Sequence, residues 1–209
     1  GGARRWDPAL RREFSEYLDE AVAKGWQFVP ETAPRILFAA GGNPLRRVRG
    51  YQKMIEHLLP KLDLLVTLDW RMSNTARHSD YVLPAAGYYE KRGIKYSVAL
   101  APYVVIGDQA VPPLGESKNE WEITALIART VQERALARGV GGALATLSDR
   151  FSDDGRFGPG DDVAVIDTIL RESPITGGLG WEEMRRAGAI PIRTAGRWGT
   201  TSAIGSEIE

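Results

Sequence analysis

The chain has 209 residues, of which 43% are hydrophobic and 26% are charged, a composition typical of a globular protein with one or two domains. Lysine plus arginine and aspartate plus glutamate balance at 27 each, so overall charge gives no reason to expect a nucleic-acid partner. The absence of cysteine excludes disulfides and cysteine-ligated zinc or iron–sulfur sites formed by this chain, and no apolar run approaches the roughly 18 residues that span a bilayer.

The first part of the sequence predicts a helix and then a buried strand. Asp7 and Pro8 form a helix-start signal, and the apolar residues that follow at helical spacing predict a helix over about 8–24. The run RILFAA at 35–40 is continuously apolar between proline and glycine, which is typical of a buried parallel strand. A loop, GGNPLRRVRG, then leads into a helix in YQKMIEHLL, which Pro60 is expected to stop.

Two further strands are predicted at 63–68, within DLLVTLDW, and at 80–83, within DYVLP. Between them MSNTARHS predicts a short helix, with Ser73 or Asn74 as its cap. The alternation of three strands with two helical segments is the βαβ pattern. It predicts right-handed crossovers and a doubly wound, mainly parallel sheet.

The remainder of the chain is less regular. The segment VALAPYVVIGDQAVPPLG is expected to be extended, broken by prolines and irregular, and SKNEWEITALIARTVQERALARG is the clearest helix. After residue 143 we expect a helix in DDVAVIDTILRES, capped by Asp161 or Asp162, and a short one in WEEMRRAGA. Few apolar residues per helix predict that this region is loosely attached, and the tail RTAGRWGTTSAIGSEIE shows no periodicity.

Polar residues follow each predicted strand, at the edge where parallel sheets bind ligands. Gly42 and Asn43 follow the first strand. Leu68 and Asp69 end the second, with Ser73 just after them. The third leads through Pro84 to Glu90 and Lys91. Glycine lets backbone amides approach a phosphate or a ring, an asparagine donates and accepts, a carboxylate accepts from ribose or guanine, and a lysine neutralises phosphate. These residues are candidates for a nucleotide site.

Each of these residues also has a structural interpretation. GGNP is an ordinary turn sequence, Asp69 could cap a helix, and Glu90 with Lys91 could be a surface pair. The cluster Arg46, Arg47 and Arg49 is compatible with a solvated face as well as with a phosphate clamp, and His78 with a surface or capping residue as well as with a metal ligand. There is no G-x-G-x-x-G and no Walker lysine loop. Spacing alone therefore supports an α/β domain with a candidate nucleotide site.

Three stretches resemble successive motifs of the molybdopterin oxidoreductases of the dimethyl sulfoxide reductase family: GGNPLRRVRG, KLDLLVTLDWRMSNTARHSDYVLPAAGYYEKRG and PPLGESKNEWEI. The resemblance covers about 33–138. It is strongest to the branch with respiratory nitrate reductase, ethylbenzene dehydrogenase and steroid side-chain dehydrogenases. One departure from many other members is IKYSVALAPYVV in place of an arginine-containing segment, which fits this branch.

The resemblance implies a Rossmann-like domain at 33–142, a helical segment at 1–32 and a loosely packed helical or irregular extension at 143–209. It implies that this domain holds the guanosine end of one pyranopterin in a bis-molybdopterin guanine dinucleotide cofactor. Carried over by motif, the cofactor-binding residues are Gly42, Asn43, Leu68, Asp69, Ser73, Lys91 and Glu120. Glu120 stands where the family usually has aspartate, so its longer side chain places that contact in question.

The resemblance also implies that the chain is an internal fragment of a catalytic subunit, inactive alone. The parent enzyme would transfer oxygen or hydroxyl with two electrons, and its iron–sulfur cysteines, molybdenum ligand and carboxyl-terminal barrel would lie outside this segment. Expected partners are other domains of that chain and an iron–sulfur electron-transfer subunit, with no nucleic acid and no direct membrane insertion. The substrate and the reaction direction stay open, as does the compartment, with the periplasm preferred over the cytoplasm. The alternatives are a free-standing nucleotide-binding module and a structural α/β domain without catalysis.

Overall fold

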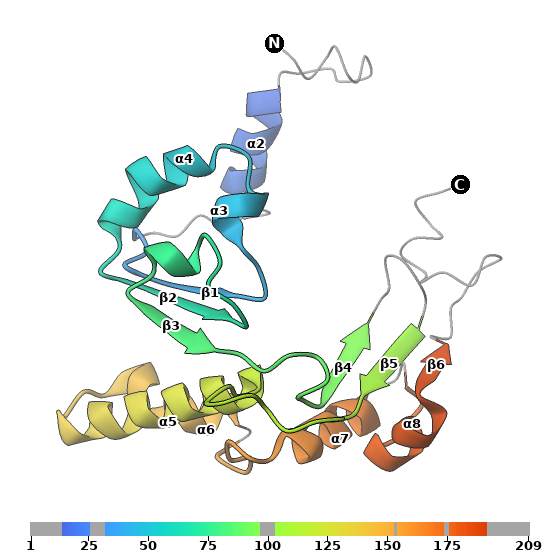
Figure 1. The fold of residues 1–209 in the computed structure, drawn as a ribbon. Helices are drawn as coiled ribbons and strands as arrows, with labels where there is room; N and C mark the ends of the chain where they lie inside the picture. Colours follow the sequence, from blue (N-terminus) through green and yellow to red (C-terminus); the bar gives the residue numbers. More distant parts are fainter. Residues whose placement is uncertain (1–13, 26–31, 97–102, 153, 174–175, 192–209) are drawn as a thin grey trace.

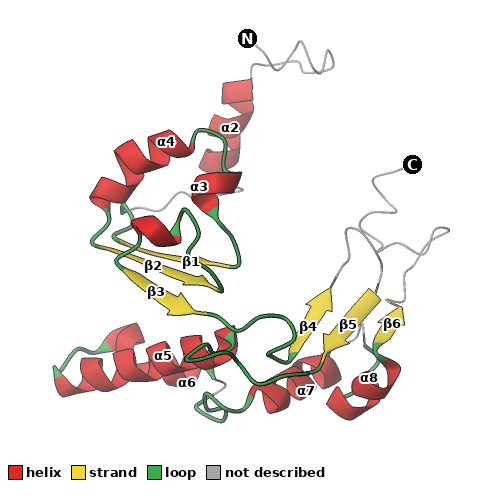
Figure 2. Cartoon of the chain, in the orientation of Figure 1, coloured by secondary structure: helices red, strands yellow, loops and turns green. Residues whose placement is uncertain are grey.

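The computed structural model describes residues 14–25, 32–96, 103–152, 154–173 and 176–191 (Figure 1). Helix α2 (Phe14–Ala23) falls within the helix predicted from the sequence, whose first residues lie outside the described part. Two sheets follow, which lie next to each other in Figure 2, each with helices beneath it.

The first sheet consists of β1 (Ile36–Ala40), β2 (Leu64–Asp69) and β3 (Tyr81–Pro84). The strands lie in the order β1-β2-β3, and both pairings are parallel. This confirms the α/β class and the three parallel strands expected from the apolar runs. Two crossovers connect the strands, so all three carboxyl ends meet at the same edge.

The crossover from β1 to β2 is less regular than the single helix predicted for it. It contains α3 (Pro44–Arg47), α4 (Tyr51–Lys53), a π-helical turn (Met54–Leu58) and a 3₁₀ turn (Leu59–Lys61). Pro60 was expected to end the helix but lies inside the last of these turns. Proline has no backbone N–H, and the N–H groups at the start of a helical turn have no partner within it, so proline is tolerated there.

The crossover from β2 to β3 is a short 3₁₀ turn (Ala76–His78). The residue at the N-cap position is Thr75, so the prediction of Ser73 or Asn74 was wrong, although the hydroxyl of Ser73 accepts a hydrogen bond from the Ala76 amide at 3.3 Å. The buried side chain of Ser73 is therefore part of the turn as well as of the strand-end region.

Helix α5 (Glu120–Ala137) covers one face of the parallel sheet. Val66 and Leu68 of β2 are buried against Ile123 of the helix, and partly buried apolar residues pack around them: Leu64, Leu83 and Ile127. The helix begins at Asn119, whose side-chain oxygen accepts from the Glu122 amide at 2.7 Å. That cap fixes the position of Glu120, the first helical residue.

The second sheet was not expected. Strands β4 (Gly93–Tyr96), β5 (Tyr103–Gly107) and β6 (Ala189–Pro191) pair antiparallel, although the sequence predicted an irregular segment around the first two. Alternating burial along β5 shows a half-buried strand, with Val104 fully buried and Val105 partly exposed. Of the prolines that suggested irregularity, Pro112 and Pro113 lie after it, and Pro102 lies outside the described residues.

The carboxyl-terminal region is packed more tightly than the loose extension we expected. After a 3₁₀ turn (Gly142–Thr146) and α6 (Leu147–Phe151), helices α7 (Asp162–Glu172) and α8 (Trp181–Ala187) cover the second sheet. A buried cluster joins these elements: Val104, Ile166, Leu170, Trp181 and Met184. Hydrogen bonds between β5 and β6 cross the expected boundary at 142/143. The domain boundaries stay a prediction, and the tail at 192–209 lies outside the described residues.

None of the helices in the described part of the chain is both long enough and apolar enough to cross a membrane.

Candidate functional site

An open pocket of about 810 Å³ lies at the carboxyl edge of the parallel sheet. All seven residues singled out from the sequence line it: Gly42, Asn43, Leu68, Asp69, Ser73, Lys91 and Glu120. They come from the ends of β1 and β2, the loop after β3 and the first residue of α5. The structure thus brings together residues that are far apart in the chain, while their role in binding a cofactor remains a prediction.

The register of the sheet explains this convergence. Ala40 at the end of β1 pairs with Leu68, so the turn that follows β1 leaves the sheet beside Asp69. Gly41 has a φ of 69°, a left-handed conformation that favours glycine and turns the chain toward the pocket. On the other side Asp69 pairs with Pro84, which places the loop carrying Lys91 at the same edge.

Asn43 is anchored across the pocket floor to the β2–β3 crossover. Its side-chain oxygen accepts two hydrogen bonds from Thr75, one from the backbone N–H at 3.2 Å and one from the hydroxyl at 2.8 Å. Asn43 precedes α3 but makes no side-chain capping bond to it. Sequence reasoning did not assign a role to Thr75, which is 2% exposed, and its place after the second strand was the only signal for it.

Asp69 is the last residue of β2 and is partly exposed. One carboxylate oxygen accepts from the amide of Trp70 at 2.8 Å, a local contact that orients the side chain at the strand end. Among the described residues Asp69 caps no helix, so that alternative interpretation does not hold. Its second oxygen remains available to a ligand.

Lys91 and Glu120 form an ion pair in the pocket, with the lysine nitrogen 2.5 and 2.6 Å from the two carboxylate oxygens. The lysine side chain is 15% exposed and the glutamate 47%, so the acid is the more accessible partner. The sequence suggested separate contacts for the two residues, and the structure couples them. Glu90 instead accepts from the Gly87 amide at 2.7 Å and lines an adjacent smaller cavity, so Glu90 and Lys91 are not a surface pair.

Two aromatic side chains form part of the pocket wall and were not predicted. Trp70 and Tyr88 meet edge to face with ring centroids 5.4 Å apart, and both are more than half exposed. The ammonium of Lys95 lies 3.9 Å from the Tyr88 ring, a cation–π contact that holds the ring in place. Single aromatic residues in loops carry no periodic signal, so only their position next to strand ends could have indicated them.

Basic residues separate into two groups. Arg46 and Arg47 line the pocket, and Arg49 of the same cluster does not. Within the described part of the chain neither Arg46 nor Arg47 has a carboxylate partner. The solvated-face interpretation therefore fits Arg49 better than its two neighbours. No group of three or more histidine, aspartate and glutamate side chains suited to a metal occurs among the described residues, and His78 belongs to none.

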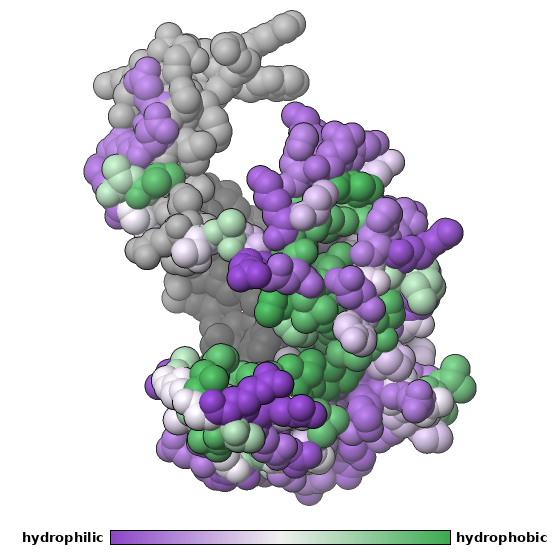
Figure 3. Space-filling view, turned by 90° about the vertical axis from the view of Figure 1, so that its left-hand side faces the viewer, coloured by the Kyte–Doolittle hydropathy of each residue, from purple (hydrophilic) through white to green (hydrophobic). Residues whose placement is uncertain are grey.

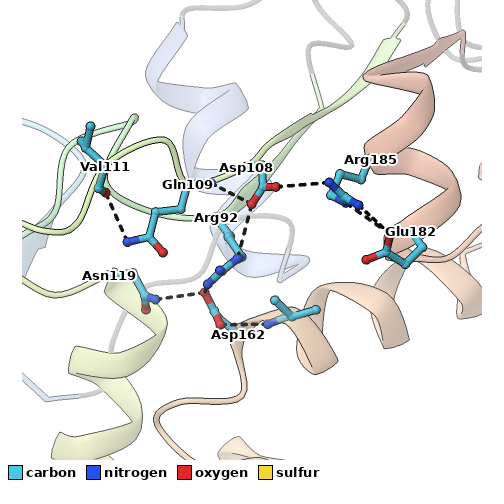
Figure 4. Close-up of polar contacts among 9 residues, drawn as sticks. Arg92, Asp108, Gln109, Val111, Asn119, Asp162, Glu182 and Arg185 are labelled. Atoms are coloured by element: carbon cyan, nitrogen blue, oxygen red, sulfur yellow. Dashed lines mark hydrogen bonds and ion pairs between the residues drawn. The ribbon is translucent and has the colours of Figure 1, made fainter.

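A polar network lies around Asp162, and two of its members are next in the chain to residues of the pocket (Figure 4). One carboxylate oxygen of Asp162 lies 3.3 Å from the side-chain nitrogen of Asn119 and 3.8 Å from Arg92. These two residues are the chain neighbours of Glu120 and Lys91. Arg92 also lies 3.4 Å from Asp108, which follows β5. The network thus connects both members of the pocket ion pair to the second sheet and to α7.

Comparison with known proteins places the sequence motifs in context. The family model described as molybdopterin oxidoreductase matches residues 13–130, more than half of the chain. The alpha subunit of dimethylsulfide dehydrogenase from Rhodovulum sulfidophilum is 33% identical over 181 residues, covering 82% of this chain and 19% of that protein. The alpha subunit of respiratory nitrate reductase from Haloferax mediterranei is 39% identical over 144 residues, covering 65% of this chain and 14% of that protein.

Among solved structures, acetylene hydratase from Pelobacter acetylenicus superposes with a TM-score of 0.54 at 22% identity, over 79% of this chain and 19% of that one. At this level of identity the likeness concerns the fold alone. In each of these comparisons the present chain spans about a fifth or less of the other protein's length.

Proposed function

The chain belongs to the molybdopterin oxidoreductase family, and from this premise we propose that its pocket binds the guanosine end of a molybdopterin guanine dinucleotide in the catalytic subunit of an oxidoreductase. The observation that carries the proposal is the convergence of seven motif residues on one pocket at the carboxyl edge of a parallel sheet. Ligands of open α/β sheets bind at this edge.

The residues present fit such a ligand. Guanine offers an N–H and an amino group side by side, and a carboxylate such as Asp69 or Glu120 accepts from both. Lys91 would orient Glu120, while each carboxylate oxygen has a further lone pair for the base. A pocket of about 810 Å³ lies in the range of small-molecule sites, which run to about 1,000 Å³.

In the parent enzyme the molybdenum carried by the pterins would supply two-electron oxygen-atom transfer or hydroxylation. The residues of this chain would anchor the nucleotide at a distance from that chemistry. The proposal extends to the bis form of the cofactor and to an iron–sulfur cluster in a preceding segment, in line with the motif resemblance.

Further domains of the same subunit are the proposed neighbours, together with an iron–sulfur partner subunit. Hydrophobic residues gather across the middle of one face of the molecule (Figure 3). On β1 the side chains of Ile36 and Phe38 are about half exposed beside the buried sheet core. Exposed apolar surface of this kind is typical of a surface that another domain covers.

Replacing Asp69 with alanine tests the proposal. In protein purified from cells that make the cofactor, Asp69→Ala should lower molybdenum and guanine content while the melting temperature changes little. A charge-assisted hydrogen bond contributes about 1.5–3 kcal/mol, or roughly tenfold to a hundredfold in affinity. Asp63→Ala is the matched control, because Asp63 precedes the same strand at its opposite end, where it forms an exposed ion pair with Arg35.

Full cofactor content in Asp69→Ala would remove Asp69 from the binding site. Guanine nucleotide without molybdenum, in wild-type protein from the same cells, would favour the alternative of a nucleotide-binding module without catalysis.

A further inference from the structure

Glu120, the acid of the pocket ion pair, lies between two residues that are both anchored to the start of α7 and the loop before it. Asn119 precedes Glu120, and its side-chain nitrogen lies 3.3 Å from a carboxylate oxygen of Asp162. Trp121 follows Glu120, and its indole N–H donates to the Gly158 carbonyl at 3.0 Å. None of these four anchoring residues is among the described residues that line the pocket. The position of Glu120 is therefore fixed from outside the pocket.

The side-chain amide of Asn119 has a defined orientation. A backbone N–H can only donate, and that of Glu122 lies 2.7 Å from one atom of the amide, so this atom is the oxygen. The amide nitrogen is consequently the atom that faces Asp162, as a donor to its carboxylate. A helix cap needs only an acceptor, which aspartate supplies as well as asparagine. Asparagine carries an acceptor and a donor on separate atoms, so it makes both contacts at once.

The carboxylate of Asp162 lies at the junction of the two segments that carry the ion pair. Its Oδ1 accepts from the Val163 amide at 3.0 Å, which fixes the carboxylate to the first turn of α7. Its Oδ2 faces Asn119 and lies 3.8 Å from the guanidinium of Arg92 (Figure 4). Each of these two residues is next in the chain to one member of the pocket ion pair. One buried carboxylate oxygen thus faces both segments.

The ion pair itself requires both segments to be well placed. The nitrogen of Lys91 lies 2.5 and 2.6 Å from the two carboxylate oxygens of Glu120, a two-point contact that a small shift of either backbone would break. Lys91 belongs to the loop after β3 and Glu120 to the start of α5, so neither element alone sets the distance between them.

We propose that Asp162 is a positioning residue of the pocket. Through Asn119 and Arg92 it holds Glu120 and Lys91 in the alignment in which the glutamate carboxylate faces a ligand. The inference rests on the proposed nucleotide function, and it extends the binding machinery to α7, beyond the residues that would touch the nucleotide.

The test exchanges the two groups that meet. Asn119→Asp keeps an acceptor for the Glu122 amide, and therefore the helix cap, but it removes the donor and places a second carboxylate opposite Asp162. Calorimetric titration of the purified 209-residue chain with guanosine should give an affinity about threefold to tenfold lower, the value of one hydrogen bond. Combining Asn119→Asp with Asp162→Asn again places a donor opposite an acceptor, with the roles reversed. It should restore the affinity to within about twofold of the wild type.

Glu120→Ala distinguishes positioning from a general loss of structure. If Asp162 acts through Glu120, Asn119→Asp should change guanosine affinity by less than about twofold in a chain that already carries Glu120→Ala, because the group to be positioned is gone. Two independent effects would instead multiply.

Gln132 offers a matched control on the same helix. Its side-chain oxygen accepts from the Ser148 amide at 2.7 Å and its nitrogen donates to Asp149 at 3.1 Å, so it joins α5 to α6 through the same two kinds of contact. Gln132 is not among the described residues that line the pocket. Gln132→Glu removes the donor as Asn119→Asp does. It should lower the melting temperature and leave guanosine affinity unchanged.

The outcomes separate this inference from the proposed function. An equal loss of guanosine affinity in Gln132→Glu and Asn119→Asp would overturn the positioning role, because general destabilisation would explain both. Failure of the exchanged pair to recover, or an equal loss with and without Glu120, would also overturn it and leave the nucleotide site standing. Absence of guanosine binding to the folded wild-type chain would overturn the proposed function, and the inference with it.

Discussion

At the scale of single residues, the pocket depends on side chains whose partners the sequence could not identify. Lys91 and Glu120 were both candidates, yet their ion pair joins residues from a loop and a helix start. Within the described part of the chain, one oxygen of Asp69 and the amide nitrogen of Asn43 have no hydrogen-bond partner, because a neighbouring group binds the other atom of each. The chemistry that each residue offers to a ligand is thus determined by a protein contact on its far side.

The carboxylate of Asp167 is expected to make the stability of the fold sensitive to acid. Hydrogen bonds from the Trp181 amide and from Arg171 lower the pKa of Asp167 below its ordinary value of 3.8. A lowered folded-state pKa contributes stability above the ordinary value, and that contribution is lost as pH falls through the folded-state pKa. Asp167→Asn keeps an acceptor for Trp181 but loses the charge.

We expect the melting temperature of Asp167→Asn to be lower than that of the wild type at pH 7, with the difference shrinking as pH falls below about 4. Thermal unfolding followed by circular dichroism at several pH values measures this. A difference of the same size at pH 7 and at pH 3 would show that the charge of Asp167 contributes nothing.

At the scale of elements, α7 allows a sharp comparison between adjacent residues. Leu170 is fully buried in the core cluster of the second sheet, whereas Ile169 next to it is 45% exposed. Leu170→Ala should lower the free energy of unfolding by about 2–5 kcal/mol, because it removes buried methyl groups and leaves a cavity. Ile169→Ala should cost about 0.5 kcal/mol or less. Urea denaturation of both variants measures the difference, and equal losses would contradict the packing described here.

The elements that the sequence predicted correctly are those with a strong local signal. The runs around Phe38, Val66 and Val82 are mainly apolar, so β1, β2 and β3 were recognisable, and the helical spacing of apolar residues indicated α5. The second sheet could not be predicted in the same way. Its third strand, β6, is three residues long and exists only through pairing with β5.

The pocket shows the same division. Strand ends predicted its candidate residues, because parallel strands deliver them to one edge. The family resemblance is confirmed by the matching family model. The contribution of Thr75 depends on a distance between two crossovers, and that of Trp70 and Tyr88 on loop geometry. Neither has a periodic pattern that a single sequence displays.

At the scale of the whole molecule, Asp162 connects the two sheets. Its side chain is 14% exposed and contacts Asn119 at the start of α5 and Arg92 before β4. Asp162→Ala would remove both contacts. The side-chain nitrogen of Asn119 and one guanidinium nitrogen of Arg92 would then each lose the carboxylate that faces it. We expect a loss of about 1–3 kcal/mol in the free energy of unfolding.

Hydrogen exchange would show where the stability of Asp162→Ala is lost. Amides of β4–β6 should lose protection before those of β1–β3, since the two sheets have separate core clusters. Asp162→Asn, which can still accept from Asn119, should fall between the alanine variant and the wild type. Uniform loss of protection over both sheets would mean that the sheets still open together without the Asp162 contacts. The network would then not be what couples them.

The pairing of Tyr103 with Pro191 means that the second sheet cannot be completed until late in synthesis of the chain. Ribosomes add about 5–20 residues per second, so the β4–β5 hairpin emerges several seconds before the strand that completes its sheet. During that interval one edge of β5 is open, and Val104 lacks the helices that later bury it. An open edge beside apolar surface can pair with another nascent chain. Translation that stops before residue 189 would therefore release a product prone to self-association.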